Sequence, residues 1–185
     1  MTKTQVAILP LILATVACSI FMGGPAYPET PIAVSTEAIG SLQDQIHAAE
    51  TAAVNSGTLT LTINESQITS LIANKLDGES DSLITDPQVY LRDGQIQIYA
   101  KAIQGNLQAN IRVVLTATLN ESGRPVISVV STDFGPLPVP EELNNAISKM
   151  VDEAFAGAIG PVVTGFRLES ITIADGIMTL TGRIK

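Results

Sequence analysis

The dipeptide Asp93-Gly94 restricts the fold most strongly, because it lies between two segments in which apolar and polar residues alternate. Such alternation is typical of β-strands with one buried face, and Asp-Gly is typical of tight hairpin turns. Residues 87–91 and 95–102 are therefore predicted to form a β-hairpin. The turn brings apolar residues opposite each other in two cross-strand pairs, Val89 with Ile98 and Leu91 with Ile96.

Two further turns extend this hairpin into a four-stranded antiparallel meander. Gly105-Asn106 suits a second tight turn, and Gly123 suits the left-handed position of a third turn at residues 121–123. A four-residue loop at the third turn would shift the register of the last strand. The predicted apolar pairs are Ile98 with Val113, Ala100 with Ile111, Ala102 with Ala109, Leu115 with Val129, and Ala117 with Ile127.

One face of this meander is apolar and must be covered, because such a face is not stable in water. Apolar residues at helical spacing predict helices over residues 36–55, over the residues that follow the N-cap Asn64, and over residues 141–159. A last hairpin is predicted around Asp175-Gly176. It pairs Ile173 with Met178, Ile171 with Leu180 and Thr172 with Thr179. The expected fold class is α+β, an antiparallel meander sheet with hairpins, one apolar face being covered by two or three amphipathic helices.

The composition excludes several classes of function. The 185 residues include 18 acidic and 10 basic side chains, a formal net charge of −8, which argues against a nucleic-acid partner. A single Cys excludes an internal disulfide framework, and one Cys with one His argues against a zinc site. Neither a nucleophile elbow nor a phosphate-binding loop is present. We therefore expect no enzymatic activity, no catalytic residue, no cofactor and no resident metal.

The carboxylates have structural explanations. Asp93 and Asp175 stand at hairpin turns, where Asp is favoured by the backbone geometry. Glu141 and Glu142 open a predicted helix, where they complement the helix dipole. Asp133 is the acidic residue that the sequence explains least.

The N-terminus is typical of an exported protein. Residues 6–22 contain no charge and follow a short segment with one Lys, so residues 1–24 are predicted to be a signal or membrane anchor. Three outcomes are open: an uncleaved anchor, cleavage near Ala26, or lipidation of Cys18, which follows Ala17 in a segment similar to a lipoprotein box. Residues 25–35 contain three prolines and are predicted to be an extended spacer. Residues 36–185 are expected to form one extracytoplasmic domain.

The middle of the apolar face is built from small side chains, which either let a helix pack closely or leave a groove for an acyl chain. If there is a groove, it is a ligand site. Its residues would be Ile98, Ala100, Ala102, Ala109, Ile111, Val113 and Ala117. The alternative is an interaction module that scaffolds envelope proteins without a ligand, with Tyr90 and Tyr99 on the polar face as aromatic contacts.

The order of elements resembles that of the YpmS-like and LmeA-like bacterial membrane-anchored extracytoplasmic proteins. The likeness is carried by residues 59–76, by the hairpin at residues 89–102, by Phe134 to Pro140 (FGPLPVP), and by the closing hairpin at residues 168–180. It implies a fold similar to tubular lipid-binding proteins and an association with phospholipids, and it supplies no catalytic residue. We therefore expect a membrane-tethered domain of the bacterial cell envelope that binds lipid or another hydrophobic ligand.

Overall fold

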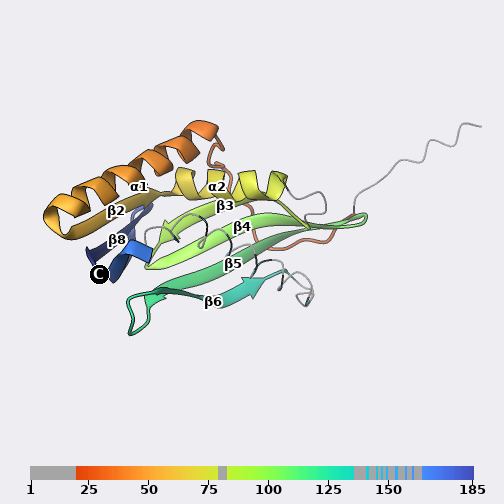
Figure 1. The fold of residues 1–185 in the computed structure, drawn as a ribbon. Helices are drawn as coiled ribbons and strands as arrows, with labels where there is room; N and C mark the ends of the chain where they lie inside the picture. The colour runs from red at the N-terminus through yellow and green to blue at the C-terminus, as the bar shows by residue number, and fades with distance from the viewer. Residues whose placement is uncertain are drawn as a thin grey trace, which may run out of the picture.

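The computed structural model describes residues 20–78, 83–135 and 164–185. Between these ranges it also describes a few single residues: Glu141, Asn145, Ile147, Lys149, Glu153, Gly157 and Gly160. The fold is α+β, as predicted, with a curled half-barrel of mainly antiparallel strands and a smaller antiparallel sheet (Figure 1). Among the described residues, no helix is long and apolar enough to cross a membrane.

The larger sheet is the predicted meander with one short strand added. Its strands are β3 (Ile84–Arg92), β4 (Gln95–Gln104), β5 (Leu107–Leu119), β6 (Pro125–Asp133) and β1 (Ile20–Phe21). The strand order is β1-β5-β4-β3, and β6 pairs with the remaining length of β5. Every predicted cross-strand pair of the meander is present, including Leu115 with Val129 at the third turn. Asp93 and Gly94 both adopt positive φ, 54° and 75°, as a tight hairpin turn requires.

The smaller sheet contains β2 (Thr58–Asn64), β7 (Phe166–Ala174) and β8 (Ile177–Ile184), in the order β2-β8-β7. The three predicted pairs around Asp175-Gly176 are confirmed. Pairing between β2 and β8, from opposite halves of the chain, was not predicted. Two turns join the sheets, because Gly94 N donates to Ile173 O at 3.1 Å and Gly176 N donates to Leu91 O at 3.0 Å.

Two helices precede the meander, α1 (Thr36–Ser56) and α2 (Glu65–Asp77). The predicted N-cap Asn64 forms a complete capping box with Gln67, in which each side chain accepts a hydrogen bond from the other residue's backbone N–H. Helix α1 packs on β2 and α2, and α2 packs along β3 (Figure 1). The two helices therefore lie where the two sheets meet.

A single apolar core joins the two sheets and the helices. It includes Leu59 and Leu61 from β2, Leu42 from α1 and Ile72 from α2. The helix predicted over residues 141–159 lies largely outside the described residues. Its described members are helical, and Ile147 is buried in the same core.

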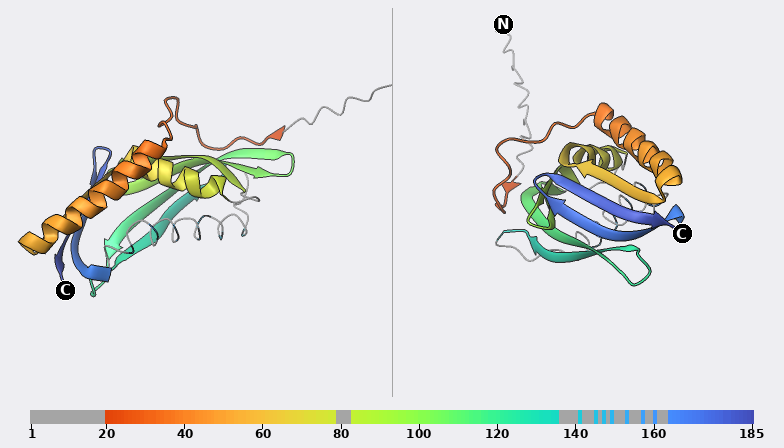
Figure 2. Two further views of the ribbon diagram at one scale, coloured as in Figure 1. Left: turned by 45° about the horizontal axis from the view of Figure 1, so that its top comes forward. Right: turned by 90° about the vertical axis from the view of Figure 1, so that its left-hand side faces the viewer.

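Residues 20–35 run along the sheet. β1 pairs in parallel with the start of β5, and residues 25–35 then cross the polar face (Figure 2). Residues 25–35, the predicted Pro-rich spacer, form no helix or strand, and they are hydrogen-bonded to the domain. Ile32 exchanges two hydrogen bonds with the side chain of the buried Gln88, and Ser35 N donates to Ser70 Oγ at 3.0 Å.

Candidate functional site

The residues predicted to line a ligand site lie together on the concave face of the half-barrel. They form three consecutive cross-strand pairs between β4 and β5: Ile98 with Val113, Ala100 with Ile111, and Ala102 with Ala109. All six are buried, whereas Ala117, further along β5, is half-buried. Strand β7 packs against β3 and β5 at one end of this face.

The alanines are concentrated at one end of the concave face. The pair Ala102–Ala109 lies two residues from the β4–β5 turn, whereas the bulkier Ile96 and Leu115 pair at the opposite end. Side-chain volume on this face therefore decreases toward the β4–β5 turn. Small side chains on a curved sheet leave volume that either a neighbouring element or a ligand fills.

The apolar face becomes accessible at β6. Val129 pairs with Leu115 and therefore lies on the concave face, yet 51% of its surface is exposed. Ile127 and Leu119, on the same face, are partly buried and pack against the core. The predicted apolar face thus extends from a closed region on β4 and β5 to a region that solvent reaches on the edge strand β6.

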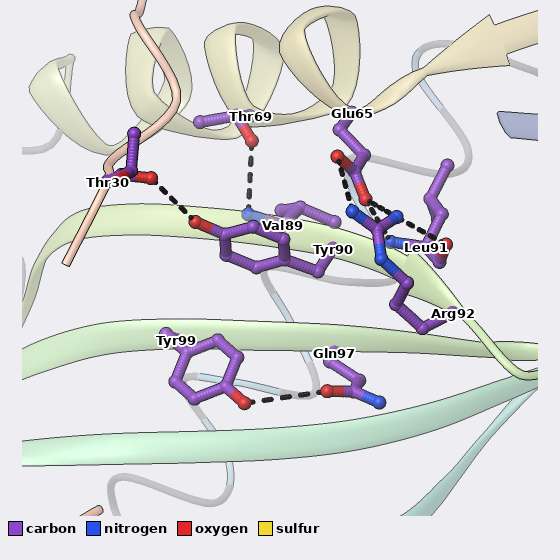
Figure 3. Close-up of polar contacts among 9 residues, drawn as sticks. All are labelled: Thr30, Glu65, Thr69, Val89, Tyr90, Leu91, Arg92, Gln97 and Tyr99. Atoms are coloured by element: carbon purple, nitrogen blue, oxygen red, sulfur yellow. Dashed lines mark hydrogen bonds and ion pairs between the residues drawn. The ribbon is translucent and has the colours of Figure 1, made fainter. Parts of the chain in front are cut away.

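The polar face carries a pair of tyrosines from neighbouring strands (Figure 3). The rings of Tyr90 and Tyr99 meet edge to face with their centroids 5.8 Å apart. Tyr90 Oη donates to Thr30 O at 3.1 Å, and Tyr99 Oη donates to Gln97 Oε1 at 3.4 Å. Burial, and then the nearby Glu65 carboxylate, raises the pKa of Tyr90. The predicted aromatic contact Tyr90 is therefore engaged by the chain's own N-terminal segment.

Tyr27 fixes the same segment to the bulge in β3. Its hydroxyl donates to Asp86 O at 2.6 Å, and the Lys101 ammonium lies 5.3 Å from the centre of its ring. Burial and then the Asp86 carboxylate raise the pKa of Tyr27 to about 12. Asp86 adopts a positive φ of 51°, and its carboxylate pairs with Lys101 at 2.6 Å.

Side chains of α2 satisfy the backbone of β3, which is an edge strand of the larger sheet (Figure 3). Thr69 Oγ1 accepts from Val89 N at 3.0 Å, and Glu65 Oε1 accepts from Leu91 N at 2.8 Å. Glu65 also forms an ion pair with Arg92. These contacts leave fewer free groups on this edge for another strand to pair with.

The carboxylates and the histidine that the structure describes have local roles. Asp93 and Asp175 have positive φ at their turns, as predicted, and Asp133 accepts from Gly135 N at 2.9 Å in a local turn. Glu153 pairs with Lys75 at 3.1 Å, and the Lys75 ammonium lowers the pKa of this carboxyl. His47 is mostly exposed beside Glu50. Among the described residues, no group of three His, Cys, Asp or Glu could hold a metal ion.

A cleft of about 750 Å³ lies at the end of the molecule where the chain terminates. Its cationic side chains have partners: Arg183 pairs with Glu169 at 3.0 Å, Arg167 donates to Glu121 O at 3.0 Å, and Lys185 donates to Thr164 O at 3.2 Å. An ionic ligand would therefore compete with contacts that already exist.

Sequence reasoning missed β1, because Ile20 and Phe21 were read as part of the apolar N-terminal run. The signal that could have revealed this strand is Gly23-Gly24, since both glycines have positive φ and Gly24 lies against Asn110 of β5. Cys18, the predicted lipidation site, lies outside the described residues.

No protein-family model matches the chain, and neither does any curated protein.

Proposed function

We propose that this protein is a non-enzymatic, membrane-tethered domain of the bacterial cell envelope that binds a lipid acyl chain on the concave face of its half-barrel. The observation that carries the proposal is the continuity of this face, from the buried alanines of β4 and β5 to the exposed Val129 on β6. The ligand class follows from the predicted lining residues on β4 and β5, which are all aliphatic and therefore suit an acyl chain.

The arrangement of polar groups supports binding rather than catalysis. The carboxylates described above serve turns or ion pairs, and the tyrosines donate to backbone or amide oxygens. The charge-free run at residues 6–22 supports export and tethering. Resemblance to the YpmS-like and LmeA-like proteins is in keeping with this proposal.

Photo-crosslinking tests the proposal. The full chain is reconstituted in phosphatidylcholine vesicles that carry a diazirine on one acyl chain, and crosslinked peptides are mapped by mass spectrometry. We expect crosslinks within β4, β5 and β6, on concave-face residues. Crosslinks confined to the first 22 residues and the β4–β5 turn, or no crosslinks at all, would contradict acyl-chain binding by this face.

A pair of variants on β6 provides the control. Val129→Glu places a charge on the concave face, whereas Val126→Glu places the same charge on the other face of the same strand, where Val126 is 41% exposed. We expect Val129→Glu to lose most of the crosslinks on β5 and Val126→Glu to keep them. Equal crosslinking in both variants would show that the acyl chain does not contact Val129.

A further inference from the structure

The tip of the β4–β5 hairpin carries an exposed apolar surface made by two distant parts of the chain. Ile20 and Phe21 of β1 are 55% and 62% exposed, and Leu107 at the start of β5 is 42% exposed. Strand pairing places Ile20 directly beside Leu107, and Ile20 N donates to Asn106 O at 2.7 Å. We name these three residues the tip surface; the short strand β1 lies beside the β4–β5 hairpin in Figure 2.

The position of this surface in the sequence indicates what covers it. Ile20 and Phe21 belong to the charge-free run of residues 6–22, which is predicted to enter or anchor to the membrane. If the anchor is a lipid on Cys18, only Ser19 lies between it and Ile20, and the two residue steps from Cys18 to Ile20 span at most about 7 Å. If the anchor is the apolar run itself, no spacer precedes β1. Either anchor leaves too little chain to hold the tip surface away from the bilayer.

The segment that follows β1 is also fixed in orientation by hydrogen bonds to β5. After β1, Met22 N donates to Gln108 O at 2.8 Å, Asn110 N donates to Gly23 O at 3.0 Å, and Asn110 Nδ2 donates to Pro25 O at 3.1 Å. Gly24 lies so close to Asn110 that a Cβ would be 2.1 Å from Asn110 O. The chain therefore leaves the hairpin tip along one defined path.

We propose that the tip surface docks on the phospholipid bilayer, with Ile20, Phe21 and Leu107 in the interfacial layer and β5 directed away from the membrane. This inference rests on the proposed function, because it assumes a tethered chain, and it adds the orientation. The alanine-rich end of the concave face, two residues from the tip, becomes its membrane-proximal end. Val129 lies opposite Leu115, which is about 27 Å along β5 from Leu107 of the tip surface.

Tryptophan fluorescence tests the orientation, since the chain contains no Trp. Leu107→Trp places a single fluorophore on the tip surface, and Phe21→Trp is a second reporter in case the first variant does not fold. The matched control is Val54→Trp, a 73% exposed position in the last turn of α1 at the opposite end of the molecule (Figure 1). Each full-length variant is reconstituted in vesicles of phosphatidylcholine with or without brominated acyl chains.

We expect brominated lipid to quench most of the fluorescence of Leu107→Trp and Phe21→Trp and to leave Val54→Trp unchanged. Equal quenching at the tip and at residue 54 would overturn the inference. An intact mass showing that the mature chain begins after residue 24 would also overturn the inference, because β1 would then be missing. Quenching at the tip surface without crosslinks on β5 would support the orientation and reject acyl-chain binding. Crosslinks on β5 without quenching at the tip surface would reject the orientation alone.

Discussion

Replacing Gly24 with Ala is expected to detach the N-terminal segment from the sheet without unfolding the core. The new Cβ would lie 2.1 Å from Asn110 O, so the segment has to move away from β5. That movement breaks the three hydrogen bonds that join Met22, Gly23 and Pro25 to Gln108 and Asn110. At about 0.5–1.5 kcal/mol for each hydrogen bond, the docked state loses roughly 2–4 kcal/mol.

Hydrogen exchange at the Asn110 amide measures this loss, because that N–H donates to Gly23 O only when the segment is docked. A loss of roughly 2–4 kcal/mol corresponds to exchange about 30- to 700-fold faster. The matched control is Gly105→Ala, which also has a positive φ, 60°, but has no atom within 4 Å of the new Cβ. It carries the backbone strain, about 1–2 kcal/mol, without the clash.

Exchange of the Asn110 amide at the wild-type rate in Gly24→Ala would refute this reasoning. The same acceleration in Gly105→Ala would also refute it, because strain at the turn and not the clash would then open the edge of β5. Either result would also remove the fixed path on which the membrane orientation depends.

Two further predictions concern the edge strand β3 and its bulge. Thr69→Val removes the acceptor of the buried Val89 N–H, so it should lower the free energy of unfolding, measured in urea, by about 1–3 kcal/mol. The control is Thr51→Val on the exposed surface of α1, which should change this free energy by less than about 0.5 kcal/mol. Similar losses in both variants would contradict the edge-capping role. For Tyr27, the folded-state pKa of about 12 exceeds the ordinary value of 10.0, so folding favours the neutral phenol. The contribution of Tyr27 to stability should be constant below pH ~10 and should decline between pH 10 and 12. The midpoint of urea unfolding should therefore decline less over this pH range in Tyr27→Phe than in the wild-type protein.

The hairpins could be predicted from the sequence because their information is local. Asp93-Gly94 and Asp175-Gly176 set the turn geometry, and the period of two then places every apolar side chain, which is why the pairs from Val89–Ile98 to Ala117–Ile127 are all present. The apolar residues of the candidate site followed from the same registers. Their burial did not, because it depends on what packs over the sheet.

The contacts that the sequence did not reveal are non-local. Pairing of Thr58 with Arg183 joins residues more than a hundred positions apart, and neither strand carries a signal that identifies its partner. Docking of residues 20–35 depends on single hydrogen bonds to Asn110, Gln88 and Ser70, which leave no periodic pattern in the sequence. The positive φ of Asp86 likewise lies at a bulge in the pairing of β3 with β4.

The pairing of β2 with β8 also determines when the protein can finish folding. β2 leaves α1 early in the chain, yet its hydrogen-bonding partner is the last strand. If the chain is exported as proposed, Leu59 and Leu61 have no partner strand until β8 has also crossed the membrane. Contacts at such sequence separation slow folding. The β2–β8 pairing thus makes completion of the smaller sheet depend on β8, and in the proposed exported protein it would delay folding until β8 has emerged.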